Sequence, residues 1–427
     1  MNIPPIRWRS PLATIFPVYY ACKLFGILPI SYANSRTIPY KNTVHFIGRK
    51  HENVPDGCFG VSKSGLVLWM AQLTLQTWTF VRMCFYLGKT LAQRQGLDCS
   101  KDNYCSVFGM LLTHSIISPI VVSLVLVRLP RSVQVLNMTG RMLLRCRYPR
   151  RWWLSPSAYA VLVFSLLIVF KLVHTVVNIP QKYPDLYYPY FTAYMVPVLF
   201  INLVGVLCVV TQHSYEDINR ELEELCYVSS KTERLIRLNA LMNDHWFLDD
   251  FMETMSNTFG TELVFTIMDI YVQLLLLVYV IIWDTVVRRV FDDNATLFVY
   301  ISGIIEFVII VGKFVYLCYR CDSSVKEGKR IIFHLKHLSS KLSNDMNSQT
   351  VLRLFTLRVN SRSIQVTASG FFDINLSLLF ATAGVVLIYF LVLVQFQIEG
   401  HKQMLESNAS NVTVEVACDS WPCLERF

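Results

Sequence analysis

Charged residues are scarce in this chain of 427 residues: Asp, Glu, Lys and Arg make up only 16% of it, whereas hydrophobic residues make up 53%. The mean hydropathy is +0.42. Water-soluble domains carry more charge, typically about a quarter of their residues. The apolar residues also form long blocks without the periodicity of soluble helices and strands. The sequence therefore predicts a polytopic membrane protein.

Motifs of enzyme active sites and metal centres are also missing. The sequence has no HExxH, no GxSxG, no glycine-rich phosphate loop and no pair of CxxC motifs at metal-binding spacing. His334 and His337 stand without a neighbouring carboxylate, which favours a solvated helix face over a metal site. We therefore predict no enzyme activity, no catalytic residue, no metal site and no cofactor.

The net charge of +9 does not indicate a nucleic-acid partner, because the basic residues follow the loops between apolar blocks. Residues 1–63 contain eight of them, and an apolar patch here mimics a signal peptide without a clear cleavage site. We expect this segment to be retained as a cytoplasmic or interfacial region. It precedes a transmembrane domain, 64–397, of seven apolar blocks that are long enough to span a bilayer: 64–87, 106–127, 157–178, 190–212, 261–283, 296–318 and 373–397.

The positions of Lys and Arg orient these seven blocks. With the N-terminus inside, the inner segments carry 28 basic residues and the outer segments carry 8, while the remaining three lie within the spans. The positive-inside rule then predicts a cytoplasmic N-terminus and an extracellular tail, 398–427. The predicted fold class is an all-α membrane protein with seven transmembrane helices.

Two long inner segments, 213–260 and 320–372, show apolar residues at helical spacing. Acidic residues follow Glu216 in the first, whereas Ile331 and Leu335 belong to an apolar stripe among basic residues in the second. Their opposite charge suits two helical regions that pack on each other below the membrane. Two separately solvated amphipathic helices fit this pattern equally well.

Glycosylation sequons agree with the orientation, because three of them fall in segments predicted to lie outside: Asn294, Asn408 and Asn411. Two more, at Asn137 and Asn375, fall in an inner segment and in a predicted helix. We expect these two to stay unmodified.

The twelve cysteines are scattered. Four of them lie in outer segments, where the oxidising environment permits disulfides: Cys99, Cys105, Cys418 and Cys423. Pairing within the two couples and pairing between them both stay open. We expect the other eight to be reduced.

Polar residues inside the predicted spans mark candidate ligand contacts, because ionisable groups are costly in a bilayer. Glu306 lies near the middle of its span, where it either neutralises a cation such as Lys171 or lines a wet cavity. Lys171 also fits a side chain that extends to the interface, as do Arg82 and Lys313 near helix ends. Aromatic residues near the outer ends suit an interfacial belt or a pocket wall. The candidate pocket consists of His114, Lys171, His174, Tyr194, Gln273, Tyr279, Tyr300 and Glu306.

The last apolar block carries the most specific pattern. It is free of charge over enough residues to cross a bilayer. Tyr389, Val392 and Phe396 share one helical face, with Gln395 beside them. Such a face either packs inside a bundle or lines a pore that an apolar ring closes.

Tyr389, five apolar residues and Gln395-Phe396 resemble the signature that ends the last helix of insect gustatory receptors, relatives of the odorant co-receptor. Residues 367–373 are similar to the family's segment before that helix. Residues 241–260 resemble the family's run before the fifth helix.

Two positions depart from the family pattern. Ile388 stands where the family usually has Thr, and Phe390 stands where the sugar-sensing branch commonly has Glu. The second departure favours a bitter or other non-sugar receptor.

The resemblance implies a gustatory chemoreceptor: a tastant-gated, non-selective cation channel in the plasma membrane of gustatory neurons. Its four subunits, alike or different, would be held together by intracellular extensions of the last four helices. The pocket would open outward. The implied pore and gate residues are Tyr389, Val392, Gln395 and Phe396.

The partners would be a small-molecule tastant, other receptor subunits and membrane lipid. Two alternative classes also suit a polytopic chain: a seven-helix receptor that signals through an intracellular partner, and a membrane transporter. The seven blocks show no convincing duplication of the kind that many transporters have.

Overall fold

The structure is a computed structural model that describes residues 16–34, 57–93, 104–145, 187–282, 294–342, 345–392, 394–396 and 399. The described part is almost entirely helical. Its longer helices are α2 (Lys63–Gln93), α3 (Tyr104–Val127), α4 (Leu129–Arg145), α6 (Tyr187–Glu224), α7 (Lys231–Ile282), α8 (Asn294–Lys341), α9 (Met346–Ser361) and a last helix (Leu376–Phe396). The shorter elements are α1 (Phe16–Leu24), η6 (Leu225–Tyr227) and the strands β1 (Ile30–Asn34), β2 (Gly57–Val61), β3 (Thr367–Ala368) and β4 (Phe372–Asp373).

Of the predicted spans, only 157–178 lies wholly outside the described residues. The described residues of the other six lie in helices, except residues 373–375, which precede the last helix. By length and composition alone, three described helices can cross a membrane: Ala193–Tyr227, Lys231–Tyr279 and Leu376–Phe396. A fourth candidate consists of Leu112–Val127 and Leu129–Leu143, which are bent by 76° at the break between them. α6, α7 and α8 are longer than their apolar blocks: α6 and α8 end after the block ends, and α7 begins before the block begins. They continue as unbroken helices into the segments predicted to lie inside.

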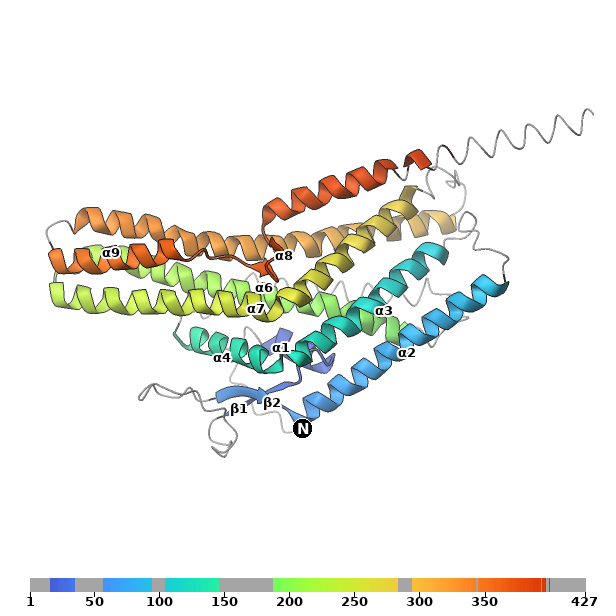
Figure 1. The fold of residues 1–427 in the computed structure, drawn as a ribbon, viewed down its shortest axis with the longest axis horizontal. Helices are drawn as coiled ribbons and strands as arrows, with labels where there is room; N and C mark the ends of the chain where they lie inside the picture. Colours follow the sequence, from blue (N-terminus) through green and yellow to red (C-terminus); the bar gives the residue numbers. More distant parts are fainter. Residues whose placement is uncertain are drawn as a thin grey trace, which may run out of the picture.

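Figure 1 shows the long extensions of α6, α7 and α8 lying side by side with α9, an assembly that we call the α9 rod. Ile331, Leu335 and Leu338 of α8 are fully buried in it. Between α6 and α8, the Asn219 amide donates to the Glu327 carboxylate at 2.8 Å. Of the two arrangements that the sequence left open, the packed one is therefore present.

His334 corrects the interpretation of a solvated histidine. Its side chain is only 5% exposed, and its Nδ1 lies 3.1 Å from the Glu223 carboxylate on α6. The partner comes from a helix that is distant in the sequence. For this reason, the local search for carboxylates missed it.

The described parts of the segment before the first span, residues 16–34 and 57–63, contribute to the folded core. α1 packs on α6, where the Cys22 thiol lies 3.7 Å from the Leu199 carbonyl oxygen. β1 and β2 form an antiparallel pair. The Asn137 amide of α4 bonds both the backbone N–H of Phe59 at 2.7 Å and its carbonyl at 3.2 Å. The side chain of this sequon is therefore engaged inside the protein.

The last helix begins at Leu376, later than the predicted start at residue 373, because β4 pairs with β3 just before it. Ser369 and Gly370 form the turn of this hairpin with φ values of 53° and 77°. Asn375 then caps the helix, since its Oδ1 accepts the Leu378 N–H at 3.1 Å. Figure 1 shows the last helix (red) standing apart from the others, and α7 bending where it passes the hairpin.

Candidate functional site: a buried polar cluster and an exposed last helix

α3 and α7 bring three polar side chains together in the membrane part of the bundle. His114 Nδ1 lies 3.2 Å from Asp269 Oδ1, and both side chains are almost fully buried. One turn along α7, Gln273 donates from Nε2 to the other oxygen of Asp269. Among the described residues, Gln273 Oε1 has no hydrogen-bond partner although the residue is only 1% exposed. A buried acceptor of this kind normally finds a donor.

Tyr194 of α6 and Lys313 of α8 extend this cluster. The rings of His114 and Tyr194 meet edge to face with their centroids 5.3 Å apart. The Lys313 amine lies 4.7 Å from the centre of the Tyr194 ring, a cation–π contact. Lys313 is only 2% exposed. The prediction that it extends to the membrane interface from a helix end is therefore wrong, because α8 continues beyond it to Lys341.

Glu306 lies two turns before Lys313 on the same side of α8, and it too is buried. Two buried charges on one helix face require compensation from their surroundings. In the sequence, the i, i+7 spacing of Glu306 and Lys313 could have identified Lys313 as a further member of this cluster. The suggested pairing of Glu306 with Lys171 stays a prediction, since Lys171 lies outside the described residues.

Gln76 of α2 is a further polar residue that the sequence analysis missed. Trp69 Nε1 donates to the Val122 carbonyl at 3.0 Å and thereby fixes how α2 runs against α3. Because the two helices are antiparallel, Gln76 comes level with Ser115, the neighbour of His114. Its side chain is fully buried, and neither polar atom of its amide has a hydrogen-bond partner among the described residues. Gln72, Gln76 and Thr79 stand at i, i+4 and i+7 and are all buried, so a polar stripe within the apolar block was a signal that the sequence offered.

The other predicted pocket residues are only partly described. Tyr279 is half-buried on α7, and Tyr300 lies in α8 but its side chain is not described. His174 lies outside the described residues, as Lys171 does. The structure therefore brings His114, Tyr194, Gln273 and Glu306 into the membrane part of the bundle, and it adds Asp269, Lys313 and Gln76.

The predicted glycosylation and disulfide residues stay predictions. Asn294 is the first residue of α8 and Cys105 lies in α3, but neither side chain is described. The others lie outside the described residues: Asn408, Asn411, Cys99, Cys418 and Cys423.

One CxxC motif, Cys318 and Cys321, lies on α8. Both thiols are free, and Cys321 Sγ lies 3.8 Å from the Cys208 thiol of α6 in the buried core. Among the described residues, no three His, Cys, Asp or Glu side chains form a group that could hold a metal ion.

The last helix differs from α6 in its surroundings, although both are long and apolar. The apolar window of α6 is 100% buried within the chain, whereas that of the last helix is 0% buried. Tyr389, Val392, Gln395 and Phe396 are all exposed, and Phe396 reaches 72%. A single subunit therefore leaves this apolar face uncovered.

A polar junction connects α3, α7 and the hairpin that leads into the last helix. Arg128, at the corner between α3 and α4, donates to the Thr258 carbonyl at 3.0 Å and to Thr261 Oγ1 at 2.8 Å. Thr261 Oγ1 lies 2.7 Å from Ser369 Oγ in the hairpin turn. Ser256 accepts the Thr367 N–H at 2.9 Å. A continuous set of hydrogen bonds thus extends from the end of α3 to the hairpin that precedes the last helix.

The sequence was also compared with known proteins. The model of the 7tm chemosensory receptor family matches residues 15–400, which is nearly the whole chain. The chain belongs to this family, the insect chemoreceptors. No curated protein matches the sequence of this receptor.

Two solved structures share the receptor's fold. One is the olfactory receptor OR5 of the insect Machilis hrabei in complex with eugenol, with 14% identity, a TM-score of 0.60 and coverage of 90% of this chain and 97% of that chain. The other is a further structure of OR5, with 14% identity, a TM-score of 0.57 and coverage of 78% of this chain and 90% of that chain. This chemosensory receptor is therefore an all-α, multi-pass membrane protein.

Proposed function

We propose that this receptor is a gustatory receptor subunit, a tastant-gated cation channel whose pore is lined by the last helix of four subunits. The ligand would bind in the membrane part of the bundle, near the cluster around His114 and Asp269. The non-sugar preference rests on Phe390, which stands where the sugar-sensing branch commonly has Glu. The resemblance further favours the plasma membrane of gustatory neurons as its location.

The cluster supports a ligand site because it combines aromatic walls with polar groups that are only partly satisfied. Gln273 Oε1 and the Gln76 amide lack partners among the described residues. A small organic molecule with a hydroxyl or carbonyl group would supply them, and Tyr194 would contact its apolar part. OR5 was solved with eugenol, a small phenol, which is consistent with this ligand class.

The observation that carries the pore proposal is the uncovered last helix. Its apolar window is 0% buried by its own chain. Apolar side chains alone would suit lipid, but Gln395 lies beside Val392 and Phe396 at the far end of the helix. Four such helices around an axis would form an apolar ring that excludes water and blocks ions. When the helices move apart, the path becomes wet and Gln395 offers an amide dipole to a cation.

Coupling requires only that the ligand bind the open arrangement better than the closed one. The junction of Arg128, Thr261 and Ser369 supplies a physical link, since α3 and α7 carry the cluster and the hairpin carries the last helix. A small change in how α3 packs on α7 would thereby reach the start of the last helix.

A current measurement tests the proposal. Cells that express Val392→Ser together with Phe396→Ser should show a raised current without ligand, because hydroxyl groups let water into the constriction. Phe380→Ser is the matched control: Phe380 is 79% exposed on a different face of the same helix, and its replacement should leave the basal current unchanged.

Basal current that is equal in the double variant and the wild type, at equal surface expression, would contradict a gate at these positions. Thiol labelling of Val392→Cys and Phe396→Cys is a further test. If these cysteines react only with lipid-soluble reagents, the helix faces lipid. A receptor acting through an intracellular partner, or a transporter, would then be the better explanation.

A further inference from the structure

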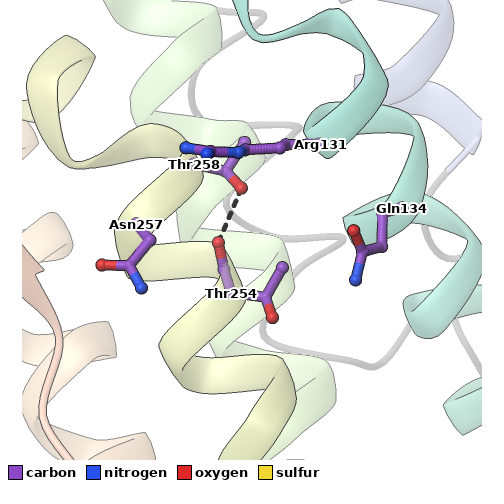
Figure 2. Close-up of a pocket in the computed structure, with 5 residues that line it drawn as sticks. All are labelled: Arg131, Gln134, Thr254, Asn257 and Thr258. Carbon is purple, nitrogen blue, oxygen red and sulfur yellow. Dashed lines mark hydrogen bonds between the residues drawn. The ribbon is translucent and has the colours of Figure 1, made fainter.

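The groove between α4 and α7 is not used by the proposed gating mechanism. It has a volume of about 390 Å³ and opens at the surface of the protein. Figure 2 shows its lining, with Arg131 and Gln134 on α4 facing residues of α7. The α7 residues are Thr254, Asn257 and Thr258.

The position of α4 places this groove at a membrane surface. α3 is apolar, and the chain turns by 76° between it and α4. α4 buries apolar residues such as Leu136 and Leu143, while Arg131 and Arg141 are exposed. The apolar face of α4 is covered by the protein itself, so its position rests on α3. Because α4 begins directly after the predicted span 106–127 ends, it lies at the level of the interface between lipid and water. The basic residues predict that this is the cytoplasmic side, where anionic lipids concentrate.

The groove is lined by hydrogen-bond donors, and none of its five lining residues is acidic. Arg131 contributes a guanidinium, Gln134 and Asn257 contribute amides, and Thr254 contributes a hydroxyl. The Thr258 hydroxyl is already used, since it donates to the Thr254 carbonyl at 2.6 Å. Donors around an exposed guanidinium are the arrangement that binds a phosphate group.

Two carboxylates of α7 close to the groove residues in the sequence are paired with other arginines, while Asp250, one turn before Thr254, is exposed. Glu262 lies 3.6 Å from Arg128, and Glu253 lies 3.7 Å from Arg362. Arg131 has no ion-pair partner among the described residues. In the sequence, no Asp or Glu occurs between Asp102 and Asp185. The α4 side of the groove therefore carries no acidic residue, and Arg131 is the guanidinium available to an anion.

We infer that the groove between α4 and α7 binds a phosphate group, carried by the headgroup of an anionic membrane lipid. Arg131 forms the charge-assisted hydrogen bond, and the Asn257 and Gln134 amides bond the remaining oxygens. The acyl chains extend from the groove toward the apolar surface of α3. This binding does not depend on whether the receptor conducts ions.

Native mass spectrometry of the purified full-length receptor tests this inference. The probe is a phosphatidylinositol phosphate, added to detergent-solubilised protein, with phosphatidylcholine as the neutral comparison. Arg131→Gln should weaken binding of the anionic lipid about ten-fold, the loss expected for one charge-assisted hydrogen bond. Arg141→Gln is the matched control, since Arg141 is exposed on the same helix but does not line the groove.

A second variant and a second probe make the outcomes decisive. Asn257→Asp places a carboxylate in the groove and should also weaken binding. Equal lipid binding by the wild type, Arg131→Gln and Asn257→Asp would overturn the inference. Inositol phosphate without acyl chains distinguishes the sources of the phosphate. Weak binding of this soluble headgroup supports a lipid ligand, whereas binding as tight as that of the lipid would overturn the lipid assignment in favour of a soluble phosphate.

Discussion

Thr261 of α7 and Ser369 of the hairpin place their hydroxyl oxygens 2.7 Å apart, although 108 residues separate them in the sequence. Gly260, the residue before Thr261, permits this approach. A Cβ atom at position 260 would lie 2.5 Å from the backbone nitrogen of Ser369. The hairpin that carries the last helix therefore rests directly on the backbone of α7, at the place where α7 leaves the α9 rod.

Gly260→Ala should uncouple ligand binding from the last helix. The new methyl group must push the Ser369 backbone away, at a cost of about 1–3 kcal/mol. We expect the maximal ligand-evoked current to fall about ten-fold at equal surface expression, measured with an agonist found by a calcium-entry screen. Gly312→Ala in α8 is the control, because its Cβ would meet no atom within 4 Å. Equal currents from the two variants would argue against the junction as a coupling element.

Asp269→Asn should weaken the response to ligand without preventing folding. The amide keeps the size of the side chain, but it removes the negative charge beside His114 and so alters the cluster in which the ligand is proposed to bind. The half-activating ligand concentration should rise about ten-fold, as expected for the loss of one charged hydrogen bond. Met268→Leu changes an exposed neighbour on α7 and should leave this concentration unchanged. An unaltered dose–response curve for Asp269→Asn would place the ligand elsewhere.

Much of this architecture follows from hydropathy, because apolar blocks mark which segments lie at the depth of the membrane. Hydropathy does not mark where a helix ends. α8 continues from Asn294 to Lys341 without interruption, so Lys313 is an interior residue and its amine contacts Tyr194. The apolar stripe through Leu335 predicted a packed rod, but the pattern could not exclude a solvated helix, since an exposed amphipathic helix has the same spacing.

Contacts between distant segments account for what the sequence did not reveal. His334 finds Glu223 on another helix, and Arg128 finds Thr261 on α7. Neither partner lies within the same turn or loop, so no local spacing predicts them. Gln72, Gln76 and Thr79 of α2 do show helical spacing, but spacing alone does not distinguish a buried polar face from an exposed one.

A substitution at Tyr215 tests how a buried hydrogen bond stabilises the α9 rod. Burial, and then the charge of Asp249, raise the pKa of Tyr215 well above its usual value, so the phenol stays protonated and donates to Asp249 at 2.9 Å. Tyr215→Phe leaves Asp249 with His245 at 3.3 Å as its remaining partner. The change should reduce the free energy of unfolding by about 2 kcal/mol, seen as a lower midpoint in a thermal unfolding assay.

Tyr227→Phe removes the same hydroxyl group from a residue that is 83% exposed, and it should leave the midpoint unchanged. If the two variants unfold at the same temperature, the bond between Tyr215 and Asp249 contributes nothing to the rod.

Asn375 determines where the last helix starts, and its replacement separates two roles of this residue. Asn375→Ala removes the cap on the Leu378 N–H and should cost the first turn about 1 kcal/mol, so that its amide hydrogens exchange about five-fold faster. Asn375→Asp keeps an acceptor oxygen at the same position but destroys the sequon as completely as alanine does. Hydrogen exchange at wild-type rates in Asn375→Asp, with fast exchange in Asn375→Ala, identifies the cap as the cause. Equally fast exchange in both variants would instead mean that the carboxamide acts in some way other than as an acceptor.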